Sequence, residues 1–256
     1  GGARTDINFE PVYIDEKNNV FCISVSGLHG GHSGAEIHNG YLNANQVMGK
    51  VLKELSKKIS FNIIDINGGK MDNAITRESV CVISTSKEDI SANINEIYTV
   101  ISSECKNTDP DIIISASKTK SEMKSMDSAS TAKIIDLLNT LPGGVIAWSK
   151  EIDGLVQTSL NLGILSHSDN KLSFSFSVRS SKDNEKNELL ARLKNIAKDF
   201  DCNITVYGEY PAWEYKEESQ LRDTMADVYK DMFGKEMTVT AIHAGLECGL
   251  FCGKIK

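Results

Sequence analysis

The stretch VQTSLNLGILSHSDNKLSFSFSVRS, residues 156–180, alternates apolar and polar side chains on both sides of a short polar segment. Apolar residues such as Phe174 and Phe176 share one face of an extended chain, and the serines between them share the other face with Arg179. This period of two predicts two half-buried strands. The Ser-Asp-Asn sequence between them predicts a hairpin turn. We therefore expect a sheet with one apolar face covered by helices and one polar face.

Outward from this hairpin, the hydrophobic pattern predicts the order β-α-β-β-α-β twice. In the first half, strands are expected near 20–27, 60–66, 78–85 and 111–117, with helices near 41–58 and 90–101. In the second half, helices are expected near 129–140 and 189–200, with strands near 145–149, 155–165, 171–180 and 203–209. Two split β-α-β units are the natural interpretation, which predicts an α+β fold, an α/β sandwich.

The pattern changes after Pro211. Ser219 can cap a helix that carries apolar residues from Leu221 to Met232, and a strand is predicted at 237–242. These last 45 or so residues are too few for a separate domain. We expect a boundary near 210–214.

Composition excludes several classes of function. The 256 residues carry a net charge of −7, so no basic surface for nucleic acid or an anionic membrane is expected. No apolar run reaches the roughly 20 residues of a membrane helix. The six cysteines are scattered through strand-like stretches, which favours a reducing compartment, and a cytoplasmic location is predicted.

No complete metal site is visible in the sequence. His167 and Asp169 have the spacing of an H-x-D ligand pair, but they lie in the predicted hairpin turn. His243 and Glu247 are four residues apart and could share a helix face, as could Cys248 and Cys252. A zinc site needs three or four grouped ligands, and no further cluster supplies them. We predict no metal bound by these residues.

Two glycine-rich stretches and one arginine remain as candidates. In GLHGGHSGAEIH, residues 27–38, the glycines allow a tight backbone that presents His32 beyond a strand end. In NGGKMDNAITRE, residues 67–78, Asn73 follows a glycine turn. Both stretches are also explained as ordinary turns, and Arg179 as a solvated residue at a strand end. Residue types alone leave these alternatives open.

Five segments, taken in order, resemble the aminoacyl-histidine dipeptidases. These are Xaa-His (carnosinase-type) enzymes of the di-zinc aminoacylase and carboxypeptidase G superfamily. The segments are GLHGGHSGAEIHNGYLNAN, NGGKMDNAITRE, LPGGVIAWSKEIDGLVQTSLNLG, SFSVRSS and HAGLECGLF.

The resemblance implies a division of the chain. Residues 12–212 would form the lid or dimerisation domain, a duplicated ferredoxin-like β-α-β-β-α-β unit with helices on one face of an antiparallel sheet. Residues 1–11 would end the catalytic segment before it, and 213–256 would be a partial C-terminal catalytic segment with a short α/β piece. The family's two zinc ions are held mostly by residues upstream of such a segment. We therefore expect this fragment alone to hold no zinc and to be inactive.

The resemblance also implies roles for single residues. His32 would stabilise the oxyanion of the reaction and Glu247 would be an acidic active-site residue. Asn73, Arg179 and Gly245 would bind the substrate, a dipeptide or short peptide. A homodimer is expected. The alternatives are a non-catalytic dimerisation or peptide-binding module and a relative that acts on N-acyl amino acids.

Overall fold

The computed structural model describes residues 1–15, 18–245 and 247–254, without the side chains of residues 247, 248, 252 and 253. The strands are β1 (Gly2–Phe9), β2 (Tyr13–Ile14), β3 (Asn19–Ser26), β4 (Gly31–His32), β5 (Asn62–Gly68), β6 (Ala74–Ile75), β7 (Ser79–Thr85), β8 (Ile113–Thr119), β9 (Ser125–Met126), β10 (Gly144–Trp148), β11 (Val156–Ser168), β12 (Lys171–Ser180) and β13 (Asn203–Tyr210). The helices are the 3-10 turn η1 (Ile37–Asn39), α1 (Ala44–Ser56), α2 (Ser91–Glu104), α3 (Ser128–Thr140), α4 (Asp183–Asp199), α5 (Gln220–Phe233) and α6 (Glu247–Lys254).

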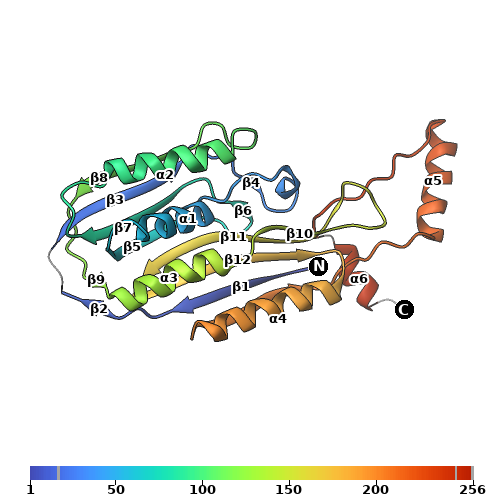
Figure 1. Ribbon diagram of the computed structural model, residues 1–256. Helices are drawn as coiled ribbons and strands as arrows, with labels where there is room; N and C mark the ends of the chain where they lie inside the picture. The colour runs from blue at the N-terminus through green and yellow to red at the C-terminus, as the bar shows by residue number, and fades with distance from the viewer. Residues whose placement is uncertain (16–17, 246, 255–256) are drawn as a thin grey trace.

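One long antiparallel sheet runs through the molecule in the order β13-β1-β12-β11-β5-β7-β3-β8, with β10 paired to β11. We call it the lid sheet. Helices α1 to α4 lie on one side of it (Figure 1), and α4 packs on β12 and β13. The predicted α+β fold with helices on one face is confirmed. The predicted hairpin is confirmed as well, because Asp169 and Asn170, between β11 and β12, have the positive φ angles of a tight two-residue turn.

The first half of the sheet follows the sequence pattern directly. Its elements come in the order β3-α1-β5-β7-α2-β8, and its strands lie in the order β5-β7-β3-β8. This is a split β-α-β unit formed by consecutive residues.

The second unit is assembled differently from the prediction. Its first strand is β1, which lies between β12 and β13, so that β1-α3-β11-β12-α4-β13 forms the second split unit. The strand expected near 145–149 is β10, an addition beside β11. The whole first unit is therefore inserted between β1 and α3.

This arrangement bears on the division of the chain. The register pairs residues 2–9 with β12 and β13, whereas residues 1–11 were expected to belong to the segment before the lid. The strand contacts favour counting β1 with the lid sheet. The limits 12–212 and 213–256 stay predictions.

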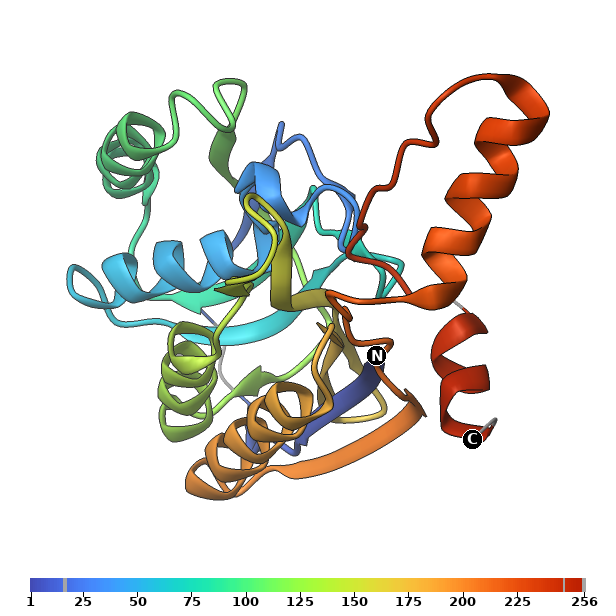
Figure 2. The same ribbon diagram turned by 90° about the vertical axis from the view of Figure 1, so that its right-hand side faces the viewer.

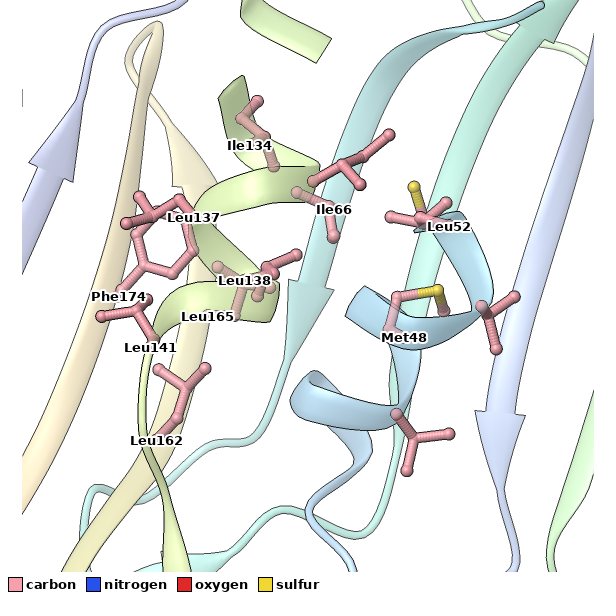
Figure 3. Packing of buried hydrophobic residues seen from close by; sticks show 14 of the residues in the cluster. Met48, Leu52, Ile66, Ile134, Leu137, Leu138, Leu141, Leu162, Leu165 and Phe174 are labelled. Atoms are coloured by element: carbon pink, nitrogen blue, oxygen red, sulfur yellow. The ribbon is translucent and has the colours of Figure 1, made fainter. Parts of the chain in front are cut away.

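The core lies between the sheet and its helices. Side chains from α1 and α3 meet residues of β5, β11 and β12, including Met48, Leu138 and Phe174, which are 0–2% exposed (Figure 3). Burying such side chains stabilises each by about 1.5–3 kcal/mol. Helices α1 and α3 begin at side-chain caps: Asn43 accepts a hydrogen bond from the N–H of Asn45, and Asp127 accepts one from the N–H of Ser130.

Within the C-terminal segment, residues 211–245 and 247–254, helix α5 lies away from the sheet (Figure 2). Ser219 caps α5 as predicted, through a hydrogen bond from the N–H of Arg222. The strand predicted at 237–242 is wrong, because these residues have no strand partner among the described residues, and Val239 and Ile242 are exposed. Helix α5 has no buried residue. Among the described residues, no helix is long and apolar enough to cross a membrane.

Candidate functional site

The two glycine-rich stretches meet at one end of the lid sheet. Strand β4 pairs with β6, which places His32 opposite Ala74. The N–H of Ser33 also donates to the carbonyl oxygen of Asn73 at 2.9 Å. Figure 1 shows β4, β6 and β10 near the end of the sheet where the C-terminal segment leaves. The fold thus brings together two candidates that are 41 positions apart in the sequence.

The hydrogen bonds of His32 determine which ring nitrogen carries its proton. Its Nδ1 accepts from the backbone N–H groups of Gly34 at 3.2 Å and Ala35 at 3.0 Å. An acceptor nitrogen is unprotonated, so in neutral imidazole the proton resides on Nε2. The backbone N–H of His32 donates to Glu36 at 2.7 Å, which tightens the same turn. His32 therefore presents an N–H donor on the side of the ring away from its own loop.

Two buried features hold this loop. The fully buried carboxylate of Asp109 accepts from the N–H groups of His29 at 2.9 Å and Leu42 at 2.8 Å, one at each end of the loop. In the middle, Ile37 packs with Ile75 and Val156 in a small apolar cluster. His32 is thus held by a braced loop rather than by a free turn.

Asn73 is positioned by a side chain of the neighbouring strand. Asn161 on β11 is 3% exposed, and its amide donates to the carbonyl oxygens of Asp72 at 3.1 Å and Ala74 at 2.8 Å. Gly163 allows this close approach, because a Cβ there would lie 2.5 Å from the Asp72 carbonyl oxygen. The predicted polar face is present on β11, but it is shielded from solvent along this part of the strand. The loop at 69–76 covers that face, and a buried amide must be hydrogen-bonded.

Arg179 lies on β12 beside a cavity of about 260 Å³ that Asn73 also lines. Arg4 lines the same cavity but forms an ion pair with Asp72. By contrast, Nε of Arg179 is buried and has no hydrogen-bond partner among the described residues. A buried donor without a partner is costly. Arg179 therefore lines the cavity with an Nε–H that no described residue accepts.

The C-terminal segment brings His243 and Gly245 to the same place. Nε2 of His243 lies 2.8 Å from Oγ of Ser159, a hydrogen bond. Burial, and then the positive charge of Arg179, lowers the pKa of His243 from its usual 6.5 to about 4. Gly245 lies against Tyr210, since a Cβ there would be 2.8 Å from the tyrosine ring. The side chain of Glu247 lies outside the part of the chain that the structure describes.

The remaining histidines do not join this site. His29 stacks on Tyr41, with 4.7 Å between ring centroids, and His38 is exposed in η1. His167 lies before the β11–β12 turn, where Nδ1 is 2.9 Å from Asp65 and Nε2 is 2.7 Å from the Tyr13 hydroxyl. His243 precedes α6, so it does not share a helix with Glu247.

Metal ligands are not grouped in the described part of the chain. No three His, Cys, Asp or Glu side chains come together there in a way that could hold a metal ion. The described residues therefore do not fit the zinc site that the resemblance implies. We derive no chemical step through a metal.

Sequence reasoning did not find several residues that shape the site. Asp109 and Asn161 act through backbone groups distant in sequence, and only the burial of a charged or amide side chain marks them. Ser159 belongs to the polar row that the alternation predicted, but its contact with His243 comes from a segment distant in the sequence. Arg4 and Asp72 carry no local signal.

Comparison with known proteins relates the chain to a family of peptidases. The family described as peptidase dimerisation domain, M20, matches residues 23–109. The cytosol non-specific dipeptidase of Escherichia coli K12 is 31% identical over 235 residues, which are 91% of this chain and 48% of that protein.

The crystal structure of aminoacylhistidine dipeptidase from Vibrio alginolyticus superposes with a TM-score of 0.90 at 28% identity. The match covers 99% of this chain and 53% of that chain, so this sequence spans about half the length of the relatives it matches. The matching family model, the sequence identity and the shared fold agree, and together they relate this chain to the M20 peptidase family.

Proposed function

We propose that this chain forms the substrate-binding and oxyanion-stabilising part of a dipeptidase that hydrolyses short peptides of Xaa-His type. The observation that carries the proposal is the hydrogen bonding of His32: Nδ1 accepts two backbone N–H groups, and Nε2–H has no acceptor among the described residues. The names of its relatives support the reaction class, since both are dipeptidases.

The proposed chemistry concerns two parts of the substrate, its scissile peptide bond and its terminal carboxylate. Hydrolysis of a peptide bond passes through a tetrahedral intermediate with a negatively charged oxygen, and a fixed N–H donor such as His32 stabilises that charge. The guanidinium of Arg179, whose Nε has no acceptor among the described residues, suits the carboxylate at the substrate's end through paired hydrogen bonds. Asn73, in the wall of the same cavity, supplies a neutral amide. Gly245 would approach the substrate with its backbone, and Glu247 would be the acidic residue.

The zinc ions that the resemblance implies would have to be held by residues other than those described here. When bound, zinc polarises a peptide carbonyl and lowers the pKa of a bound water. The part we assign to this chain is to orient the peptide and to donate a hydrogen bond where negative charge develops.

The test compares two histidines of one loop in the natural protein that contains this sequence. Hydrolysis of β-alanyl-histidine is measured with and without a chelator. His32→Ala should lower kcat by about 10²–10³, which is the usual effect of removing one oxyanion donor, and should change KM little. His38→Ala is the matched control and should leave both constants near those of the wild type. Normal kcat in His32→Ala would make the loop a simple turn, and turnover that survives chelation would contradict the zinc dependence.

We further propose that the protein is a homodimer that associates through the first unit. The family description of residues 23–109 supports this, as does the position of β8 at the end of the strand order. An edge strand offers unpaired backbone groups to a second copy, and Ile113 on β8 and Val100 on α2 are more than half exposed. Light scattering should give twice the chain mass, and Ile113→Lys should shift it toward the monomer. A monomer at high concentration would contradict the proposal.

A further inference from the structure

His243 contacts both halves of the candidate site. Its carbonyl oxygen lies against Gly34, where a Cβ would be only 2.7 Å away, next to the ring of His32. Its side chain reaches in the other direction, to the hydroxyl of Ser159. From the sequence alone, this histidine is a candidate only as a metal ligand. Its contacts instead place it between the His32 loop and strand β11.

Ser159 connects His243 to Arg179. Strands β11 and β12 are in a register that places Ser159 directly opposite Arg179. Directly opposed residues of neighbouring strands project from the same face of the sheet, with Cβ atoms about 4.5–5.5 Å apart. Ser159 is 1% exposed, and the hydrogen bond between its hydroxyl and Nε2 of His243 places the imidazole over this end of the polar row. His243 therefore forms part of the wall beside the guanidinium.

The charge of the residue in this wall matters to Arg179. The nearby Arg4 already pairs with the carboxylate of Asp72, whereas Nε of Arg179 finds no acceptor among the described residues. An acidic side chain at position 243 would pair with Arg179 and compete with a ligand. A cationic one would repel it. Burial and the charge of Arg179 keep the pKa of His243 low, so its imidazole is neutral at ordinary pH.

We propose that His243 is a positioning residue that walls one side of Arg179 with a neutral side chain and so keeps the guanidinium unpaired for a ligand carboxylate. This inference rests on the proposed function for the identity of the ligand. In this proposal His243 affects the affinity for a carboxylate through Arg179, and it does not touch the reacting atoms.

Charge-changing variants test the proposal in the natural protein that contains this sequence. His243→Glu should weaken binding of a carboxylate about 10-fold or more. The new glutamate would pair with Arg179, and the ligand would then lose its hydrogen bond to the charged guanidinium. His243→Gln, which is neutral and can still bond Ser159, should stay within about threefold of the wild type. Ala241→Glu is the matched control, because it adds the same charge at an exposed position of the same segment and should change affinity by less than about twofold.

Binding is measured by chemical-shift titration with N-acetyl-L-alanine, and N-acetyl-L-alaninamide is the uncharged comparison. Thermal denaturation shows that each variant is folded. Three results would overturn the proposal: His243→Glu binding like the wild type, His243→Gln binding as weakly as His243→Glu, or no preference of the wild type for the carboxylate. In the hydrolysis assay, the expected effect of His243→Glu is a raised KM with kcat within about threefold. The two proposals can fail separately. If His243→Glu weakens carboxylate binding and His243→Gln does not, but the protein has no dipeptidase activity, only the proposed function is contradicted.

Discussion

Helices α1 and α5 carry the same kind of apolar stripe but differ in what it contacts. In α1, Met48 and Leu52 are fully buried against the lid sheet. In α5, Leu221 and Met232 are about 70% exposed, and no residue of the helix is buried. The comparison teaches that helical periodicity identifies the face a helix can bury. Whether that face is buried depends on what the rest of the molecule places beside it.

The largest expected change in the free energy of unfolding distinguishes the lid sheet from the C-terminal segment. Phe174→Ala removes a fully buried ring and should lower the free energy of unfolding by about 3–5 kcal/mol, measured by urea denaturation. Met225→Ala, at a 55% exposed position of α5, should change it by less than about 0.5 kcal/mol. A loss above about 1 kcal/mol in Met225→Ala would mean that α5 packs against a surface in solution.

A pH titration tests whether the C-terminal segment is joined to the lid sheet at His243. The pKa of this histidine is about 4 in the folded protein, against 6.5 for an unperturbed histidine. Between these values the unfolded chain binds the proton and the folded chain does not, so stability is lost as pH falls from about 6.5 to about 4. The loss is at most about 3 kcal/mol, because solvent screens a partly exposed group.

His243→Gln should flatten this dependence in unfolding curves recorded across the same pH range. The titration of the His243 ring, followed by NMR, gives the second measurement. A pKa near 6.5 for His243 would show that the segment leaves the sheet in solution. The part of the C-terminal segment at the candidate site would then be as loosely packed as α5.

Arg179 tests the contribution of the lid sheet to binding. Arg179→Ala should raise KM for a dipeptide about 10- to 100-fold with a smaller change in kcat, since the guanidinium would bind a carboxylate that is present throughout the reaction. Arg179→Lys should restore little, because an ammonium lacks the planar fork. The protein should stay folded, as Nε of Arg179 holds no other described group in place. Unfolding of both variants would assign Arg179 to the structure instead.

The smallest expected change in stability comes from removing the N-terminal side-chain caps of two helices, one in each region. Asp127→Ala removes the cap of α3 in the core and should lower the free energy of unfolding by about 1 kcal/mol. Ser219→Ala removes the cap of α5, whose melting exposes no buried side chain, so it should lower helix content without moving the global transition. Hydrogen exchange of the α5 amides measures this local effect. If both variants lowered the free energy of global unfolding equally, α5 would be as much a part of the cooperative fold as α3.

Local pattern was sufficient for most of the secondary structure. The alternation in residues 171–180 predicted β12, and the polar segment before it predicted the turn at Asp169 and Asn170. The period of α1 predicted the helix and its buried face. These features depend on neighbours within a few residues, which sequence displays directly. The strand predicted at 237–242 failed because apolar residues form a strand only beside a partner.

The sequence by itself determined most of the elements, the family resemblance and three candidates, His32, Asn73 and Arg179. Only the tertiary structure decided that β1 starts the second unit, that the loop at 69–76 covers Asn161, and that His243 lies beside Ser159. The reason is physical. Strand pairing and the burial of polar groups depend on residues far apart in the chain, and their hydrogen bonds leave no periodic trace in the sequence.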